Sequence, residues 1–69
     1  MTLTVSKRAN INDDWTEVKT GSRNHCAAFL EQQHAGGSLD EFDVYCGEEC
    51  IFPGGSAYAA ADFLRSVTD

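Results

Sequence analysis

Three cysteines and two histidines are the side chains of this chain best suited to nucleophilic or metal chemistry. Cys46 and Cys50 are separated by three residues, whereas zinc hairpins usually place their cysteines two or four residues apart. No second ligand pair with tight spacing comes from His25, Cys26 or His34. On a helix, the adjacent His25 and Cys26 point about 100° apart and make a poor nucleophile–base pair. The sequence therefore predicts no catalytic residue, no metal and no cofactor.

The cysteines and two short motifs offer disulfide, phosphate-binding and calcium-binding chemistry as further possibilities. Cys46 and Cys50 flank a short turn, so they are either two reduced strand cysteines or the partners of a strained, redox-responsive disulfide. The enzymatic alternative is a thiol- or metal-dependent activity at these two cysteines. Cys26 is expected to be a small core residue. Gly54-Gly55-Ser56 resembles the start of a phosphate cradle but lacks the lysine of a P-loop, so we interpret it as a loop and a helix cap. The acids at 40–43 lack the spacing of an EF-hand.

The charge distribution is the strongest signal in the sequence. The net charge is −6, and residues 24–64 contain seven acids and no lysine or arginine. Such a surface attracts a basic partner and repels nucleic acid and anionic membranes. No run of residues approaches the roughly 18 apolar positions of a membrane span, and the N-terminus lacks the apolar stretch of a signal peptide. With three cysteines, an odd number, the protein is expected in the cytosol.

Helices and strands must position these residues, and one sequence pattern that is typical of a helix occurs twice in the chain. The dipeptide Gly-Ser, six intervening residues and the dipeptide Phe-Leu occur at 21–30 and again at 55–64. Each serine is a natural N-cap, and Phe29 and Phe63 fall on the apolar face of the following helix. Helices are therefore expected at about 22–35, ended by Gly36-Gly37, and at 56–67, with Val67 on the second apolar face.

The segments before each helix show the alternation of half-buried strands. Phe42, Val44 and Cys46 alternate with Glu41, Asp43 and Tyr45, a turn follows at 47–49, and Pro53 is expected to end the return strand at 50–52. In the first half, strands are expected around 3–5 and 15–19, and the rival for 12–18 is a short helix capped by Asn12. The prediction is one domain over residues 1–69 with an α+β fold: a four-stranded, mainly antiparallel sheet with two helices on one face (ββαββα).

This layout predicts where the acids lie. If Phe42 and Val44 face the helices, then Glu41 and Asp43 face solvent on the open side of the sheet. Glu48 and Glu49 occupy one hairpin tip, and the matching connection of the first half carries further acids. The predicted contact surface is one continuous acidic face made of Asp13, Asp14, Asp40, Glu41, Asp43, Glu48 and Glu49.

A small acidic domain without catalytic residues resembles the phage-borne inhibitors of bacterial defence, which include the anti-CRISPR proteins and other DNA mimics. The resemblance covers the whole chain and lies in its length, its acidity and its expected α+β build. It implies a non-enzymatic inhibitor that binds a basic nucleic-acid-binding protein in the host cytoplasm and blocks DNA recognition. The large subunit of a type I CRISPR surveillance complex is such a partner.

The alternative from the class of binding modules is a small partner protein or antitoxin-like subunit. Such a module would pack on a basic protein through aromatic side chains, which dominate interface energetics. The candidate anchors are Trp15, Tyr45, Phe52 and Tyr58.

Overall fold

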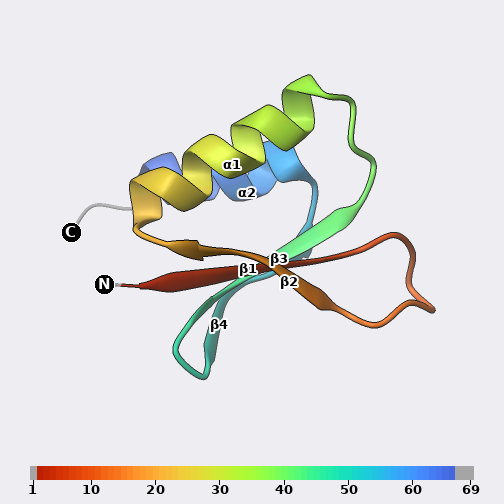
Figure 1. Ribbon diagram of the computed structural model, residues 1–69, viewed down its shortest axis with the longest axis horizontal. Coiled ribbons are helices and arrows are strands. Elements are labelled where there is room, and N and C mark those ends of the chain that lie inside the picture. Colours follow the sequence, from red (N-terminus) through yellow and green to blue (C-terminus); the bar gives the residue numbers. More distant parts are fainter. Residues whose placement is uncertain (1, 67–69) are drawn as a thin grey trace.

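A four-stranded antiparallel sheet lies beneath two helices in the computed structural model, which describes residues 2–66 (Figure 1). The elements are β1 (Leu3–Arg8), β2 (Thr16–Gly21), α1 (Arg23–Ala35), β3 (Glu41–Cys46), β4 (Glu49–Gly55) and α2 (Ala57–Ser66). The strand order is β2-β1-β3-β4, and every neighbouring pair is antiparallel. The predicted α+β fold with the order ββαββα is confirmed.

The core lies between the two helices and one face of the sheet. The central strands contribute Leu3, Val5, Phe42 and Val44, all of which are buried. The helices contribute small and branched side chains, namely Cys26, Ala27, Leu30, Ala57, Ala60, Ala61 and Leu64. Phe29 and Phe63 were expected among the core anchors, but both are only half-buried and pack around its margin. Alanine positions let the helices approach the sheet closely around the buried Phe42 ring, so the phenylalanines of the helices lie at the margin.

Both predicted helix caps are present. The hydroxyl of Ser22 accepts a hydrogen bond from the backbone N–H of His25, and Ser56 accepts one from Ala59. Each bond satisfies an N–H group that the first helical turn leaves free. At the end of α1, Gly37 adopts the left-handed conformation with a φ of 81°. Val67, predicted on the apolar face of the second helix, lies outside the described residues.

The two ββα halves meet where β1 pairs antiparallel with β3, and Val5 lies opposite Val44 in this pairing. β1 and β3 form the centre of the sheet and each half ends in a helix. The connection between β1 and β2, residues 9–15, is longer than the turn between β3 and β4, residues 47–48. Because the central strands are antiparallel, these two equivalent hairpins point towards opposite ends of the sheet (Figure 1).

The strand expected around 15–19 is confirmed as β2, and its rival, a short helix over 12–18, does not form: residues 12–15 lie in the connection, and from Thr16 on the chain pairs with β1. One local prediction is wrong. Pro53 does not end β4, which continues to Gly55, where it pairs with Phe42. β4 is an edge strand with a register shift in this region, and a bulged edge tolerates a residue that lacks a backbone N–H.

Candidate acidic surface and its groove

The acids predicted to form one face belong to two separate ends of the sheet. Asp13 and Asp14 lie in the β1–β2 connection, at the end where Arg8 pairs with Glu41. Glu48 and Glu49 lie at the β3–β4 turn, beside Cys46, at the other end. Five residue steps along β3 separate these ends, which corresponds to about 17 Å. The prediction of one continuous acidic face is therefore wrong, because the equivalent hairpins of an antiparallel centre diverge.

Ion pairs across the sheet neutralise two of the predicted contact residues. Nε and Nη2 of Arg8 both lie 2.8 Å from Oε2 of Glu41. Nζ of Lys7 lies 3.5 Å from Oδ2 of Asp40. The sequence separates these bases and acids by more than thirty positions, and only the register of β1 against β3 brings them together. Asp40 and Glu41 therefore contribute less to the field than the sequence suggested.

Asp43 is the clearest correction, since it was predicted to face solvent and is only 4% exposed. Alternation places its side chain on the open face, but β3 is a central strand with neighbours on both sides. Its Oδ1 atom has no hydrogen-bond partner. Burial raises the pKa of this carboxyl, while the backbone N–H of Ser6 and the charge of Arg8 act in the opposite direction. Asp43 cannot be part of a contact surface.

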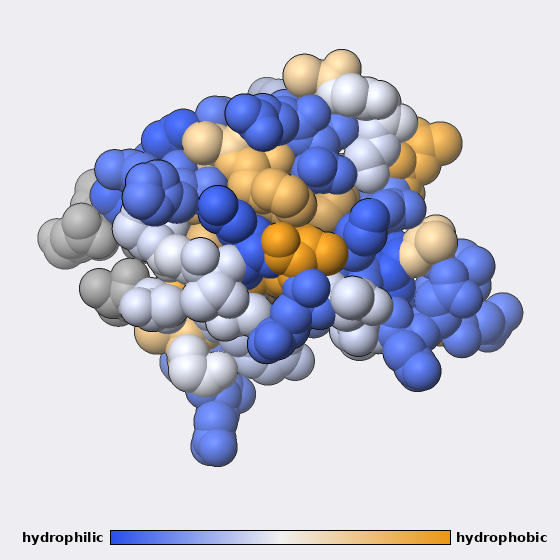
Figure 2. Space-filling model, in the orientation of Figure 1, coloured by the Kyte–Doolittle hydropathy of each residue, from blue (hydrophilic) through white to orange (hydrophobic). Residues whose placement is uncertain are grey.

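The acids that remain available stand at the two ends. Asp13, Asp14, Glu48 and Glu49 are exposed and take part in none of the ion pairs within residues 2–66. The space-filling view shows strongly hydrophilic surface at the right-hand end and along the lower edge of the molecule (Figure 2). Glu17 is a further exposed acid that sequence reasoning left out, although its position in the expected strand at 15–19 was visible.

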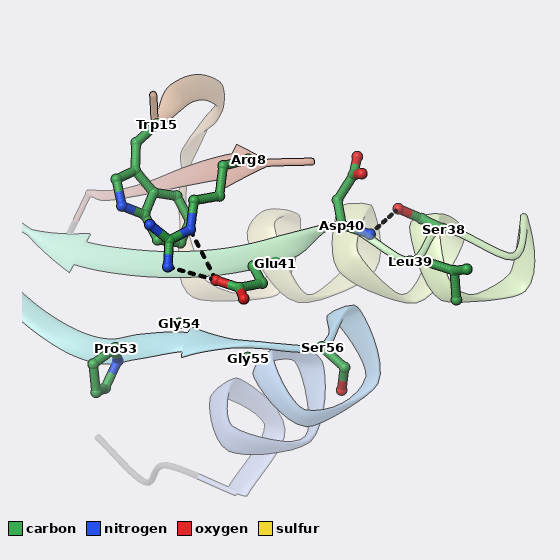
Figure 3. A pocket seen from close by; sticks show the side chains of 10 residues that line it. All are labelled: Arg8, Trp15, Ser38, Leu39, Asp40, Glu41, Pro53, Gly54, Gly55 and Ser56. Atoms are coloured by element: carbon green, nitrogen blue, oxygen red, sulfur yellow. Dashed lines mark hydrogen bonds and ion pairs between the residues drawn. The ribbon is translucent and has the colours of Figure 1, made fainter. Parts of the chain in front are cut away.

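A groove opens at the end of the sheet that carries Asp13 and Asp14. It has a volume of about 670 Å³ and lies between the start of β3 and the end of β4 (Figure 3). The guanidinium carbon of Arg8 lies 4.5 Å from the centroid of the Trp15 ring, a cation–π contact. The lining residues are Arg8, Trp15, Ser38, Leu39, Asp40, Glu41, Pro53, Gly54, Gly55 and Ser56.

Gly54 keeps the groove open on the β4 side, and the adjacent Gly55 makes room for the Phe52 ring. A Cβ atom at Gly54 would lie 3.8 Å from Oε2 of Glu41 and 4.0 Å from the Trp15 ring, so a side chain there would occupy the groove. A Cβ at Gly55 would approach the Phe52 ring to 2.8 Å, which no real Cβ tolerates without a shift. The Gly54-Gly55-Ser56 motif therefore leaves space beside Glu41 and caps α2. The motif was interpreted as a loop followed by a helix cap. The cap is present, but both glycines belong to β4 and not to a loop.

The aromatic side chains proposed as anchors do not form one cluster. Phe52 is half-buried and stacks near Phe63, with ring centroids 5.5 Å apart. Tyr58 is 61% exposed on α2, where it contacts His34. Trp15 is 37% exposed and lines the groove. Tyr58 shares a hollow on the helices with Glu31 and Asp62, whereas Trp15 lies at the end of the sheet that carries Asp13 and Asp14.

The cysteines are separated by the hairpin register. Cys46 pairs with Glu49 and packs against the core, whereas Cys50 pairs with Tyr45 on the open face. Successive strand residues project to opposite faces, so a disulfide between Cys46 and Cys50 is disfavoured. Electrostatic interaction with the nearby Cys50, and then with Asp43, raises the pKa of Tyr45.

Cys26 is fully buried, as predicted, and burial raises the pKa of its thiol. Among residues 2–66, no three side chains of His, Cys, Asp or Glu are arranged to share a metal ion.

No protein-family model matches the chain, and no curated protein or solved structure shows detectable similarity to it. Within the described residues, neither helix has the length and apolar character needed to span a membrane.

Proposed function

We propose that this protein is a non-enzymatic inhibitor that occupies a basic DNA-binding surface of a bacterial defence complex. The observation that carries the proposal is the set of exposed acids without basic partners at the two ends of the sheet: Asp13, Asp14, Glu48 and Glu49. They are presented by hairpins of a paired sheet, so their positions are fixed before a partner binds. Fixed charges lose less entropy on binding than charges on a flexible chain.

The spacing of the acidic ends suits a surface that normally holds DNA. Successive phosphates of one DNA strand are about 3.4 Å apart along the axis. The stretch of β3 between the two ends is about 17 Å long, and the acids lie beyond it on both sides, so they span at least roughly five such steps. A protein that binds duplex DNA places lysine and arginine side chains at such intervals. Carboxylates at both ends can pair with two groups of these bases, and they offer no backbone that can be cleaved. The two neutralised pairs lie at the end that carries Asp13 and Asp14, and the open face between the two ends carries the buried Asp43.

The partner class follows from the same charges. With a net charge of −6, the protein is repelled by nucleic acid and attracted by the proteins that bind it. The partner that we propose is the large subunit of a type I CRISPR surveillance complex, where target duplex first docks. Binding there would block DNA recognition, as in the anti-CRISPR and DNA-mimic inhibitors that the chain resembles in class.

A competition assay tests the proposal with charge reversals at each end. A purified type I surveillance complex is bound to a fluorescent target duplex, and displacement is measured against protein concentration. The Asp13→Lys, Asp14→Lys variant and the Glu48→Lys, Glu49→Lys variant should each displace about tenfold less well than the parent, because each variant loses two exposed contacts that contribute up to about 1 kcal/mol apiece.

The matched control carries Glu31→Lys and Asp62→Lys on the helices, which alters net charge equally and should displace nearly as well as the parent. Equal losses in all three variants would show that only net charge matters. If the parent displaces no DNA, the mimic proposal fails for this complex.

The second candidate is a protein-interaction module anchored by an aromatic side chain. It is favoured by one observation, the position of Trp15 in a groove beside exposed Leu39. Salt separates the two candidates, because binding that depends on acidic ends weakens steeply as ionic strength rises, whereas binding through an apolar anchor weakens less.

A further inference from the structure

The groove beside Trp15 has apolar side chains that are available for contact. Leu39 is 95% exposed at one side of it, Pro53 lines the β4 side, and Trp15 lies across from them (Figure 3). Scattered exposed apolar residues are ordinary in proteins, but here a leucine, a proline and a tryptophan line one hollow. Such a hollow can accept one apolar side chain of a partner.

A second hollow adjoins the groove and is acidic. It has a volume of about 420 Å³ and shares Arg8 and Asp40 with the groove. Its other lining residues are Lys7, Ala9, Asp13, Asp14 and Thr16. Lys7 and Arg8 are already paired with Asp40 and Glu41, so the charge left in this hollow is that of the two acids in the β1–β2 connection. An apolar hollow therefore lies directly beside one that favours a cation.

The residues of both hollows are held in place before a partner arrives. Glu41 fixes the Arg8 guanidinium, and Arg8 lies over the Trp15 ring. In the β1–β2 connection, Asn10 accepts a hydrogen bond from the N–H of Asn12 at 2.9 Å and donates one to the Asp13 carboxylate at 3.2 Å. Preorganised side chains lose little conformational entropy on binding.

We infer that these two hollows bind a segment of the partner protein in which an apolar side chain is followed by arginine or lysine. The apolar side chain packs between Trp15 and Leu39, and the basic side chains pair with Asp13 and Asp14. The inference rests on the proposed function in taking the partner to be basic, and it names the end of the sheet that makes the specific contact. Glu48 and Glu49 lie at the other end of the sheet. They attract the basic partner by their charge, because the groove lined by Trp15 does not adjoin them.

Trp15 is the single tryptophan of the chain, so its fluorescence reports on the groove directly. The probe is the peptide acetyl-Gly-Leu-Arg-Lys-Gly-amide, titrated into the full chain at low salt. Two matched peptides replace the leucine by serine, or the two basic residues by glutamates. The parent peptide should bind about tenfold more tightly than either, since each matched peptide lacks one of the two contacts.

Variants locate the contact on the protein. Leu39→Ser should weaken the parent peptide but not its serine version, whereas Asp13→Asn, Asp14→Asn should weaken both basic peptides. The controls are Tyr58→Ser, which removes an exposed aromatic side chain from α2, and Glu31→Gln, Asp62→Asn, which removes two acids from the helices. Thermal unfolding of each variant shows that its fold is retained. Backbone amide shifts by NMR at 13–16 and 39–41 provide a readout independent of fluorescence.

Several results would overturn the inference. Equal binding of the leucine and serine peptides would mean that only charge is recognised, and shifts centred on 47–50 would place the contact at the other end. A change in Trp15 fluorescence with protein concentration alone would mean that a second copy of the chain occupies the groove. If the peptides fail to bind while DNA displacement succeeds, the groove inference fails and the proposed function stands. The converse result removes the mimic proposal and supports the interaction module.

Discussion

Asp43→Asn is the substitution that best tests the burial of Asp43 on the open face of the sheet. The carboxyl is 4% exposed, its Oδ1 atom has no hydrogen-bond partner, and burial raises its pKa. A raised pKa means that the folded state binds the proton more tightly than the unfolded state. The stabilising effect of the proton is thus present below the ordinary pKa of aspartate. It is lost as pH rises through the folded value.

Asparagine has nearly the same shape and does not titrate, so it removes this loss. A buried polar group without a partner costs roughly 1–3 kcal/mol, and more if it is charged, while the attraction of Arg8 offsets part of the cost. We therefore expect Asp43→Asn to be more stable than the parent by about 1 kcal/mol at pH 7. Near pH 3 the two proteins should be almost equally stable, because the parent carboxyl is then protonated.

The assay is urea unfolding of both proteins from pH 3 to pH 8. The quantity of interest is the difference in free energy of unfolding, which cancels the other titrating groups. Glu31→Gln is a useful comparison, since a hydrogen bond from Arg65 lowers the pKa of Glu31 and its contribution is lost as pH falls. If Asp43→Asn is less stable than the parent at pH 7, or if the difference is independent of pH, the burial argument is refuted. DNA displacement by Asp43→Asn should equal that of the parent.

Two further predictions concern the core and the cysteines. Leu64→Ala should lower the free energy of unfolding by roughly 3–4 kcal/mol because Leu64 is fully buried, and Phe63→Ala by only about 2 kcal/mol because Phe63 is half-buried. Urea unfolding of both variants measures this order. A larger loss of stability for Phe63→Ala would contradict the assigned helix face. The Cys46→Ser, Cys50→Ser variant should retain DNA displacement with a modest loss of stability, because both thiols lie beside the acids of the β3–β4 turn without supplying their charge; stoichiometric zinc in the parent protein, measured by metal analysis, would disprove this.

Much of the fold was predictable because it depends on interactions close in sequence. A serine cap before Phe-Leu at helical spacing identifies both helices, and the alternation of Phe42 and Val44 identifies the buried face of a strand. Two such halves in the order ββα leave few ways to bury their apolar faces. An alternative stayed open at Asn12, whose segment suited a helix cap or the connection before β2, and an error arose at Pro53, because an edge strand continues past it.

The sequence by itself determined the charge, the order of the elements and the face to which most strand residues point. These are set by residue type and by the periodicities of the backbone, which need no knowledge of distant partners. Only the tertiary structure decided which acids are available. Arg8 reaches Glu41 because β1 and β3 pair in one register, and Asp43 is buried because β3 has neighbours on both sides. The two acidic hairpins point apart because the central strands are antiparallel, a relationship between residues more than thirty positions apart.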